Sequence, residues 1–183
     1  MNKEILNKLD FVISNRHLCC IKREYIDDYH MHGFPSKHNN SFVLLEYEYD
    51  FEFDGYKIIR LQDITEARYQ ESERFGEHIF AQEGIMTSNS CIIEKIDSFE
   101  DIFAQFMKKG ENIIIECEKE ENFFLIGRAV DISIGYIDFL SFNGVGVWDK
   151  TTTKIEFEHI TCITFGSRYI NIISKYIEPY PKA

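Results

Sequence analysis

The sequence predicts a mainly β protein with short α-helices, built from two similar halves. Most of the 183 residues fall into short apolar or alternating runs bounded by turn residues, which is typical of strands. Two segments instead repeat apolar residues at helical spacing, and one seven-residue block recurs in both halves. With 44% hydrophobic and 15% aromatic residues, the chain has enough apolar side chain to build a packed core.

The first half is expected to open with a short helix over residues 2–9. Ile5, Leu6 and Leu9 would share one face of that helix, because side chains three and four apart are neighbours on a helix surface. The pattern then becomes strand-like. The strands expected in this half are 11–14, 18–25, 42–53, 56–61 and 65–69.

The second half is expected to open with a clearer helix, which begins after Ser98 and ends before Gly110. Ser98 is a typical N-cap, Asp101 stands at the capping-box position, and glycine is the residue that most often follows a helix end. Phe99, Ile102, Phe103 and Phe106 repeat between them at helical spacing. The strands expected to follow are 112–117, 123–132, 136–142, 154–158 and 161–165.

The two halves share short sequence matches as well as a pattern. Residues 59–65 (IRLQDIT) align without a gap on 155–161 (IEFEHIT), with apolar residues at the first, third and sixth places and threonine at the seventh. Weaker matches pair 21–23 with 126–128, and Phe75-Gly76 with Phe165-Gly166. We interpret these matches as an internal duplication with a period near 100 residues. The alternative is that two β-rich halves match by chance.

A helix followed by about five short, bent strands resembles the Sm-like and SH3-like small β-barrels. The resemblance implies two tandem small barrels, each led by a helix, over residues 1–96 and 97–183. No Gly/Ser/Pro-rich linker separates the halves, so we expect them to pack closely. The second half is also similar to segments of uncharacterised bacterial proteins, which names no activity.

Composition and cysteine spacing narrow the class of protein. The formal charge is −11, and no run of about 18 apolar residues or secretory-type leader is present, so we expect a cytoplasmic protein without a membrane partner. The five cysteines form no CxxC pair, and buried thiols are the expected reading. No phosphate loop, dinucleotide fingerprint or nucleophile elbow appears, which disfavours an enzyme and implies no cofactor.

The most unusual segment runs from residue 46 to residue 54, where acidic and aromatic residues alternate. If the segment is one strand, its carboxylates share one face, because successive strand side chains point to opposite sides. The hypothesis is a docking surface for a basic partner; the alternative is a solvated strand face. The acidic residues of this candidate surface are Glu46, Glu48, Asp50, Glu52 and Asp54.

Two further candidates are weaker. His30 and His32 would share a face if they lie on a strand, and imidazole is a common metal ligand, but an HxH pair alone predicts no metal site. The alternative there is an exposed polar loop. Arg168 follows Gly166 and could hold a carboxylate or phosphate of a partner, or pair with an acid of this chain.

We therefore expect a non-enzymatic protein-binding module with an acidic face, of which an inhibitor or immunity-type protein for a basic partner is one version. Two alternatives stay open. The Sm-like resemblance implies nucleic-acid binding, although the negative charge and scattered lysines and arginines oppose phosphate contact. A small ligand between the two barrels is the other. Homo-oligomers are compatible with all three.

Overall fold

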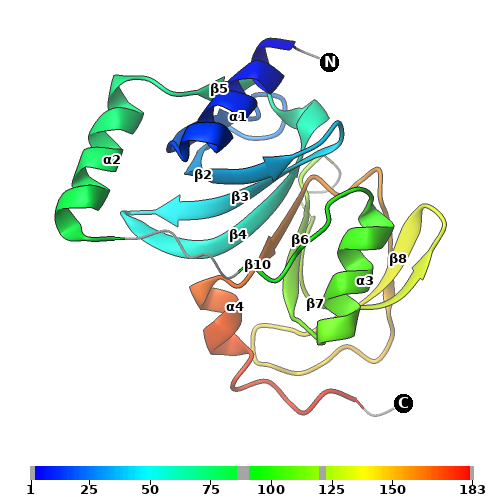
Figure 1. The fold of residues 1–183 in the computed structure, drawn as a ribbon. Helices are drawn as coiled ribbons and strands as arrows, with labels where there is room; N and C mark the ends of the chain where they lie inside the picture. The colour runs from blue at the N-terminus through cyan, green and yellow to red at the C-terminus, as the bar shows by residue number, and fades with distance from the viewer. Residues whose placement is uncertain (1–2, 86–90, 120–122, 182–183) are drawn as a thin grey trace. The chain divides into compact units, whose positions relative to one another are not determined.

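The fold is described by a computed structural model of residues 3–85, 91–119 and 123–181. Antiparallel strands dominate, with four short α-helices among the described residues, so the predicted mainly β class is confirmed. The chain divides into two compact units, Met1–Glu94 and Lys95–Ala183 (Figure 1). Within this part of the chain no helix is long and apolar enough to cross a membrane.

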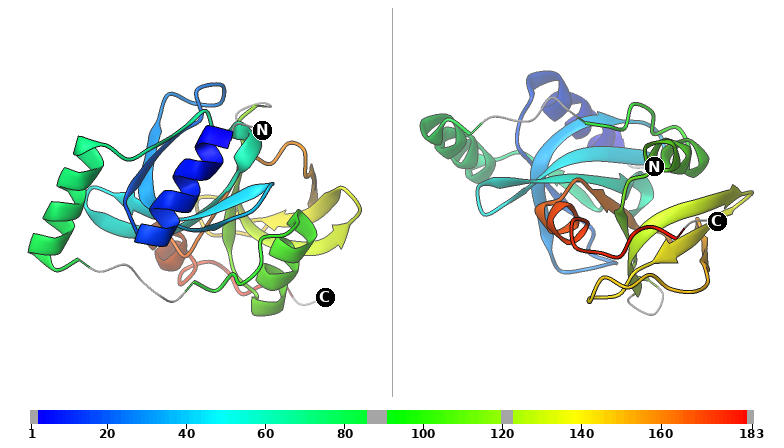
Figure 2. Two further views of the ribbon diagram at one scale, coloured as in Figure 1. Left: turned by 45° about the horizontal axis from the view of Figure 1, so that its top comes forward. Right: turned by 90° about the horizontal axis from the view of Figure 1, so that it is seen from below.

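The first unit is a five-stranded antiparallel sheet with a helix before it and a helix after it. Its strand order is β5-β1-β2-β3-β4. Helix α1 packs against β2 and β5, and α2 follows the last strand (Figure 2). Its elements are α1 (Lys3–Asn15), β1 (Cys19–Lys22), β2 (His30–His38), β3 (Phe42–Tyr49), β4 (Glu52–Arg60), a 3₁₀ turn η1 (Leu61–Asp63), β5 (Glu66–Arg68) and α2 (Glu71–Glu83).

The second unit repeats this plan. Its strand order is β10-β6-β7-β8-β9, so in both units the fifth strand lies beside the first. Ser98 caps the opening helix through the amide of Asp101, and Gly110 ends it at a φ of 65°, as the sequence predicts. Its elements are α3 (Phe99–Lys109), β6 (Ile113–Cys117), β7 (Phe123–Ser133), β8 (Tyr136–Ser141), β9 (Thr153–Glu156), β10 (Cys162–Phe165) and α4 (Arg168–Ile173).

The strand registers of the two units also correspond. Gly33 of β2 stands opposite Cys19, and Gly127 of β7 stands opposite Ile113. At both glycines an added Cβ would strike a carbonyl oxygen of the next strand, 2.2 Å from Glu46 in one unit and 2.0 Å from Leu140 in the other. These glycines allow the same close approach of two strand backbones.

A register shift follows each glycine at the same distance along the strand. It lies between Pro35 and Lys37 on β2 and between Ala129 and Asp131 on β7. Such irregularities bend a strand and increase its twist. The second strand of each unit is therefore bent at an equivalent place.

The recurring seven-residue block performs one structural task in both units. Its threonine, Thr65 or Thr161, donates its backbone N–H to a carbonyl of the first strand, Lys22 or Glu116, at 2.9 Å. The threonine hydroxyl is within hydrogen-bond distance of that same carbonyl in each unit. Each hydroxyl also accepts the amide of the residue two positions further along the chain, Glu24 or Glu118, just beyond the end of the first strand. The block therefore fixes the entry of the fifth strand beside the first.

The two weaker sequence matches are wrong. The registers place β1 on β6, so Ile21 corresponds to Ile115 and not to Ile126 of β7. Phe75 lies inside helix α2, whereas Phe165 ends strand β10. These matches arose because dipeptides and tripeptides recur easily in a β-rich sequence without sharing a structural position.

The expected closed barrels are not found. Among the described residues no ladder joins β4 to β5 in the first unit or β9 to β10 in the second, so neither sheet closes on itself. The fifth strands have three and four residues, and their ladders are formed with β1 and β6.

Several element boundaries also differ from the prediction. Residues 11–14 continue helix α1 instead of forming a strand, because Val12 extends the buried stripe begun by Ile5 and Leu9. Strand β2, helix α2 and helix α4 were not predicted. Strand β2 contains Gly33 and Pro35, which weaken a strand pattern, and α2 is mostly polar with a narrow buried face.

Helix α2 contacts the first unit's sheet through a few side chains. Gly76 lies against Leu18, where an added Cβ would come within 2.8 Å of that side chain. Further along the helix, Phe80 packs on Phe34 of β2 and Phe53 of β4. Between strand and helix, Glu77 accepts hydrogen bonds from the Leu18 amide and the Tyr69 hydroxyl. The start of α2 is thereby held over the face that carries Cys20.

Candidate functional site

The acidic segment does not form the single strand that the sequence predicts. Strand β3 ends at Tyr49 and β4 begins at Glu52, so Asp50 and Phe51 form the turn of a hairpin. Both turn residues have positive φ, 51° and 63°. A two-residue hairpin turn requires such angles, but it usually takes asparagine, aspartate or glycine there. Because phenylalanine is not a typical turn residue, the sequence pattern did not predict this turn.

The hairpin divides the five predicted carboxylates among different environments. Glu46 is buried, and Glu48 is half-buried and accepts the backbone amide of Phe51 at 2.7 Å. Asp50 and Glu52 are exposed, and Asp54 is half-buried. The segment therefore does not present five carboxylates on one open face.

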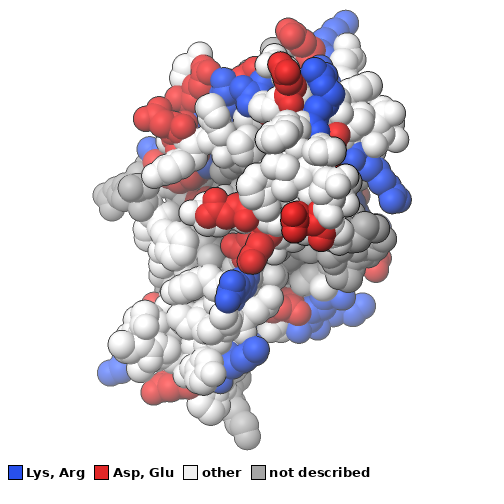
Figure 3. Space-filling view, turned by 90° about the vertical axis from the view of Figure 1, so that its left-hand side faces the viewer, with Lys and Arg blue, Asp and Glu red and all other residues white. Residues whose placement is uncertain are grey.

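What the hairpin does expose is a mixed acidic and aromatic tip, formed by residues 49–52. Tyr49 and Phe51 are 62% and 44% exposed beside Asp50 and Glu52, which are exposed as well. Across the face drawn in Figure 3, acidic side chains lie among lysines and arginines, with uncharged areas between them. We call residues 49–52 the hairpin tip.

Arg168 belongs to the second unit. It is exposed at the first position of α4, after Ser167, whose hydroxyl caps the helix through the amide of Ile170. Gly166 precedes the cap with a φ of 65°, as expected for a turn glycine.

The HxH pair lies on a strand, not on a loop. His30 and His32 both belong to β2 and share a face, with His30 opposite Lys22 and His32 opposite Cys20. His30 is exposed, whereas His32 is half-buried. The two histidines therefore have different surroundings, and only His32 reaches other potential ligands.

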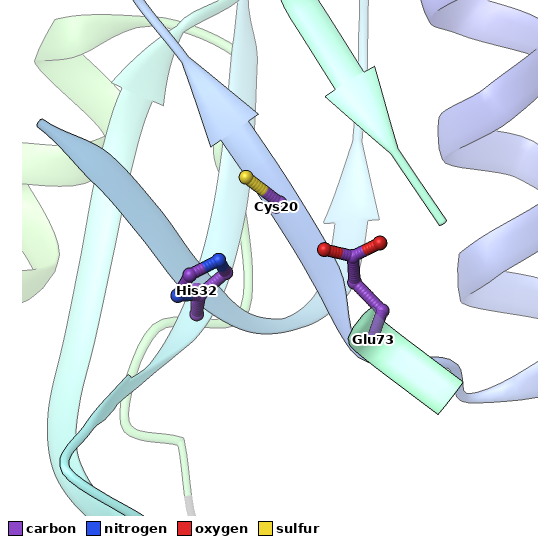
Figure 4. A group of neighbouring side chains, drawn as sticks. All are labelled: Cys20, His32 and Glu73. Atoms are coloured by element: carbon purple, nitrogen blue, oxygen red, sulfur yellow. The ribbon is translucent and has the colours of Figure 1, made fainter. Parts of the chain in front are cut away.

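His32 belongs to a cluster with Cys20 and Glu73, drawn in Figure 4. One potential ligand atom from each side chain lies within 4.8 Å of those of the other two. The three residues come from β1, β2 and the first turn of α2. We call these residues the Cys20 cluster.

Glu73 is the most constrained member of the cluster. Its Oε1 accepts from Arg68 at 2.8 Å and from Ser72 at 2.8 Å, and its Oε2 accepts from the amide of Gln70 at 2.7 Å. Burial alone would raise the pKa of Glu73, but these hydrogen bonds outweigh it and hold that pKa below the usual range. Glu73 is therefore a buried carboxylate at neutral pH.

Cys20 and His32 are less engaged. Burial raises the pKa of the Cys20 thiol, so at neutral pH it is protonated and a poor nucleophile. Within the described part of the chain the His32 ring has no hydrogen-bond partner. The arrangement thus offers a sulfur, a nitrogen and an oxygen at close range, but not an activated thiolate.

Sequence reasoning named His32 but missed its neighbours. Cys20 reads as a core thiol, and Glu73 lies in a segment where no helix was expected. One local signal was present, since glutamine at 70 and glutamate at 73 have capping-box spacing, and that box does form at the start of α2.

A second group of potential ligands is less organised. Glu156, Glu158 and His159 lie within 4.8 Å of one another at the end of β9. Glu158 is exposed, and the three residues are near neighbours in sequence, so a single turn brings them together. Exposed acidic groups often meet in this way without a ligand.

Comparison with known protein families, with curated proteins and with solved structures finds no significant match. The residues and their geometry are therefore the basis for any assignment of function.

Proposed function

We propose that the protein is a non-enzymatic binding module whose hairpin tip docks on a basic protein partner. The observation that carries this proposal is the exposure of Tyr49 and Phe51 beside Asp50 and Glu52. Aromatic residues are enriched in protein interfaces, and acidic groups around them steer a basic partner and reject an acidic one. An inhibitor or immunity-type role is the concrete version of this function.

The backbone of the tip supports the proposal. A non-glycine residue in the left-handed region costs about 1–2 kcal/mol, and Phe51 is bulkier than the residues that usually accept it. Glycine would form the same turn without this cost. An aromatic residue at this position is explained if its ring contacts a partner. Within the unit, the ring centroids of Phe51 and Phe80 lie 6.0 Å apart.

The architecture belongs to the same proposal. Two units with one strand order, equivalent glycines and equivalent threonine contacts support a tandem duplication of an Sm-like unit, with domains over 1–96 and 97–183. After a duplication, one copy can acquire a new binding surface while the other copy keeps the original one. The hairpin tip belongs to the first copy.

The experiment is a pull-down with the full chain from lysate of the native host, with and without nuclease, at low and high salt. The test variant is Asp50→Lys/Glu52→Lys. The matched control is Asp28→Lys/Asp131→Lys, which changes the net charge equally at two other exposed acids.

A basic protein captured by the natural chain and the control, lost with the tip variant and weakened by salt, is the expected result. Equal capture by both variants would refute docking through the tip. Capture that disappears on nuclease treatment would overturn the proposal in favour of nucleic-acid binding.

A further inference from the structure

Each of the three positions of the Cys20 cluster has a structural counterpart in the second unit. Cys20 stands opposite His32 and Arg68, and in the other unit Ile114 stands opposite Ile126 and Thr164. Glu73 is the third residue of the helix that follows the fifth strand, and Ile170 holds that place in α4. The counterparts of Cys20, His32 and Glu73 are therefore Ile114, Ile126 and Ile170.

Two further acids extend the correspondence. Glu46 supplies the carbonyl that meets Gly33, as Leu140 does for Gly127. Glu48 stands opposite His32 on β3, and Phe142 hydrogen-bonds to the backbone of Ile126 in the second unit. The five counterparts Ile114, Ile126, Leu140, Phe142 and Ile170 form one buried hydrophobic cluster.

The two units carry different types of residue at these equivalent positions. The second unit shows that this fold accepts an apolar core at all five positions. The first unit instead carries one cysteine, one histidine and three glutamates there. A buried polar group costs free energy unless it is paired, and replacing it with an apolar residue is often neutral or stabilising. Glu73 has a local role in folding, as the cap of α2 and the partner of Arg68, but that role does not require a cysteine and a histidine beside it.

We propose that Cys20, His32 and Glu73 bind a zinc ion. Thiolate, imidazole and carboxylate are the three ligand types that zinc accepts in proteins, and a site with three protein ligands leaves one position for an additional ligand. The ligand atoms of a tetrahedral site with bonds of about 2.0–2.3 Å lie about 3.3–3.8 Å apart. The observed limit of 4.8 Å closes to that spacing through small side-chain rotations.

The surroundings allow the ion to enter. Glu73 Oε2 accepts a single hydrogen bond, from the Gln70 amide, so it keeps a lone pair while Oε1 remains with Arg68 and Ser72. Cys20 and Glu73 are buried and His32 is half-buried, so an ion would enter the site past His32. Zinc displaces the proton of the Cys20 thiol on binding, and that proton passes to solvent.

The test is zinc binding by the full chain, purified without metal, followed by equilibrium dialysis and by Co²⁺ absorption as a report on thiolate ligation. The variants are Cys20→Ser and His32→Gln. The matched controls are Cys19→Ser, the adjacent thiol on the opposite face, and His30→Gln, the exposed histidine on the same face. Circular dichroism checks that each variant is folded.

One equivalent of zinc and a thiolate–cobalt band are expected for the natural chain and both controls. Each test variant should bind at least about tenfold more weakly, since even loss of a group that only supports a ligand costs that much. Absence of binding, or binding lost with His159→Gln instead, would overturn the proposal.

Glu73→Gln is unsuitable as the decisive variant because Glu73 also caps α2 and pairs with Arg68. A second measurement tests binding even if a variant is partly unfolded. Zinc should raise the melting temperature of the natural chain, since a ligand that binds only the folded state stabilises it. It should leave that of His32→Gln unchanged. An equal rise in both would refute His32 as a ligand.

Discussion

The correspondence between the two units can be tested by converting the polar cluster of the first into the apolar core of the second. The variant carries Cys20→Ile, His32→Ile, Arg68→Thr and Glu73→Ile. Arg68 is included because Thr164 is its counterpart and because it would otherwise lose the carboxylate with which it pairs. The volume added at Cys20 is offset by the volume removed at Arg68.

The expected magnitude follows from the contacts of Glu73. Replacing a buried ion pair with packed apolar residues is neutral or stabilises a protein by about 1–4 kcal/mol. Loss of the capping box of α2 costs about 1 kcal/mol. The fourfold variant should therefore unfold with a free energy between about 1 kcal/mol lower and about 3 kcal/mol higher than that of the natural chain, measured without metal.

The single substitutions should behave in the opposite way. Arg68→Thr leaves the Glu73 carboxylate, 1% exposed, without its cation, which costs about 3 kcal/mol. Glu73→Ile costs less, because the Arg68 side chain is 22% exposed and can reach water. The combined variant should then be more stable than Arg68→Thr by at least about 2 kcal/mol.

Urea denaturation of the full chain, followed by circular dichroism, measures these differences. The reasoning would be refuted if the costs of the single substitutions added up in the fourfold variant. That result would mean that the four substituted positions are not equivalent in the two units, or that their polar residues are needed for folding.

Three further predictions concern the fold and the ion pair. Gly127→Ala should destabilise the protein by at least about 2 kcal/mol, because its Cβ would lie 2.0 Å from the Leu140 carbonyl oxygen. The control Gly144→Ala places its Cβ in open space and should change the free energy of unfolding by less than about 0.5 kcal/mol. Equal effects of the two substitutions would contradict the close approach at Gly127. Thr161→Val should cost about 1–3 kcal/mol by removing the hydroxyl bound to Glu116, with Thr161→Ser close to the natural chain in a thermal melt; a neutral valine variant would argue against the role of the block. Because the pKa of Glu73 is lowered in the folded state, its contribution to stability is complete above the ordinary value of 4.5 and is lost as pH falls through the folded pKa. In Glu73→Gln the free energy of unfolding should therefore depend less on pH below 4.5. An unchanged pH dependence would show that other groups produce it.

Local signals in the sequence were enough to predict part of the fold. Helix α3 was predicted with its caps because Ser98 and Gly110 act on backbone groups within one turn. The seven-residue block was recognised because its apolar positions and its threonine recur in both halves without a gap. Strand β2 and helix α2 were missed, since Pro35 and a mostly polar helix give weak local patterns.

The candidate sites divide in the same way. The exposure of Asp50 and Glu52 depends on a hairpin turn in which phenylalanine takes a glycine-like conformation, and no local rule predicts that. His32 could be identified as a potential ligand, but Cys20 and Glu73 are 12 and 41 residues away in the sequence. Only strand pairing and the docking of α2 bring them together.

The β-rich class and the caps of α3 could be predicted from the sequence, because apolar spacing and cap hydrogen bonds act within a few residues. The repeated block was visible as a repeat, although its threonine bonds a residue 43 or 45 positions away. The tertiary structure alone decided that neither sheet closes, that the acidic segment turns back on itself, and that a cysteine, a histidine and a glutamate share one buried space. These outcomes depend on which strands pair and in what register, and pairing energies between distant segments leave no pattern in the order of residues along the chain.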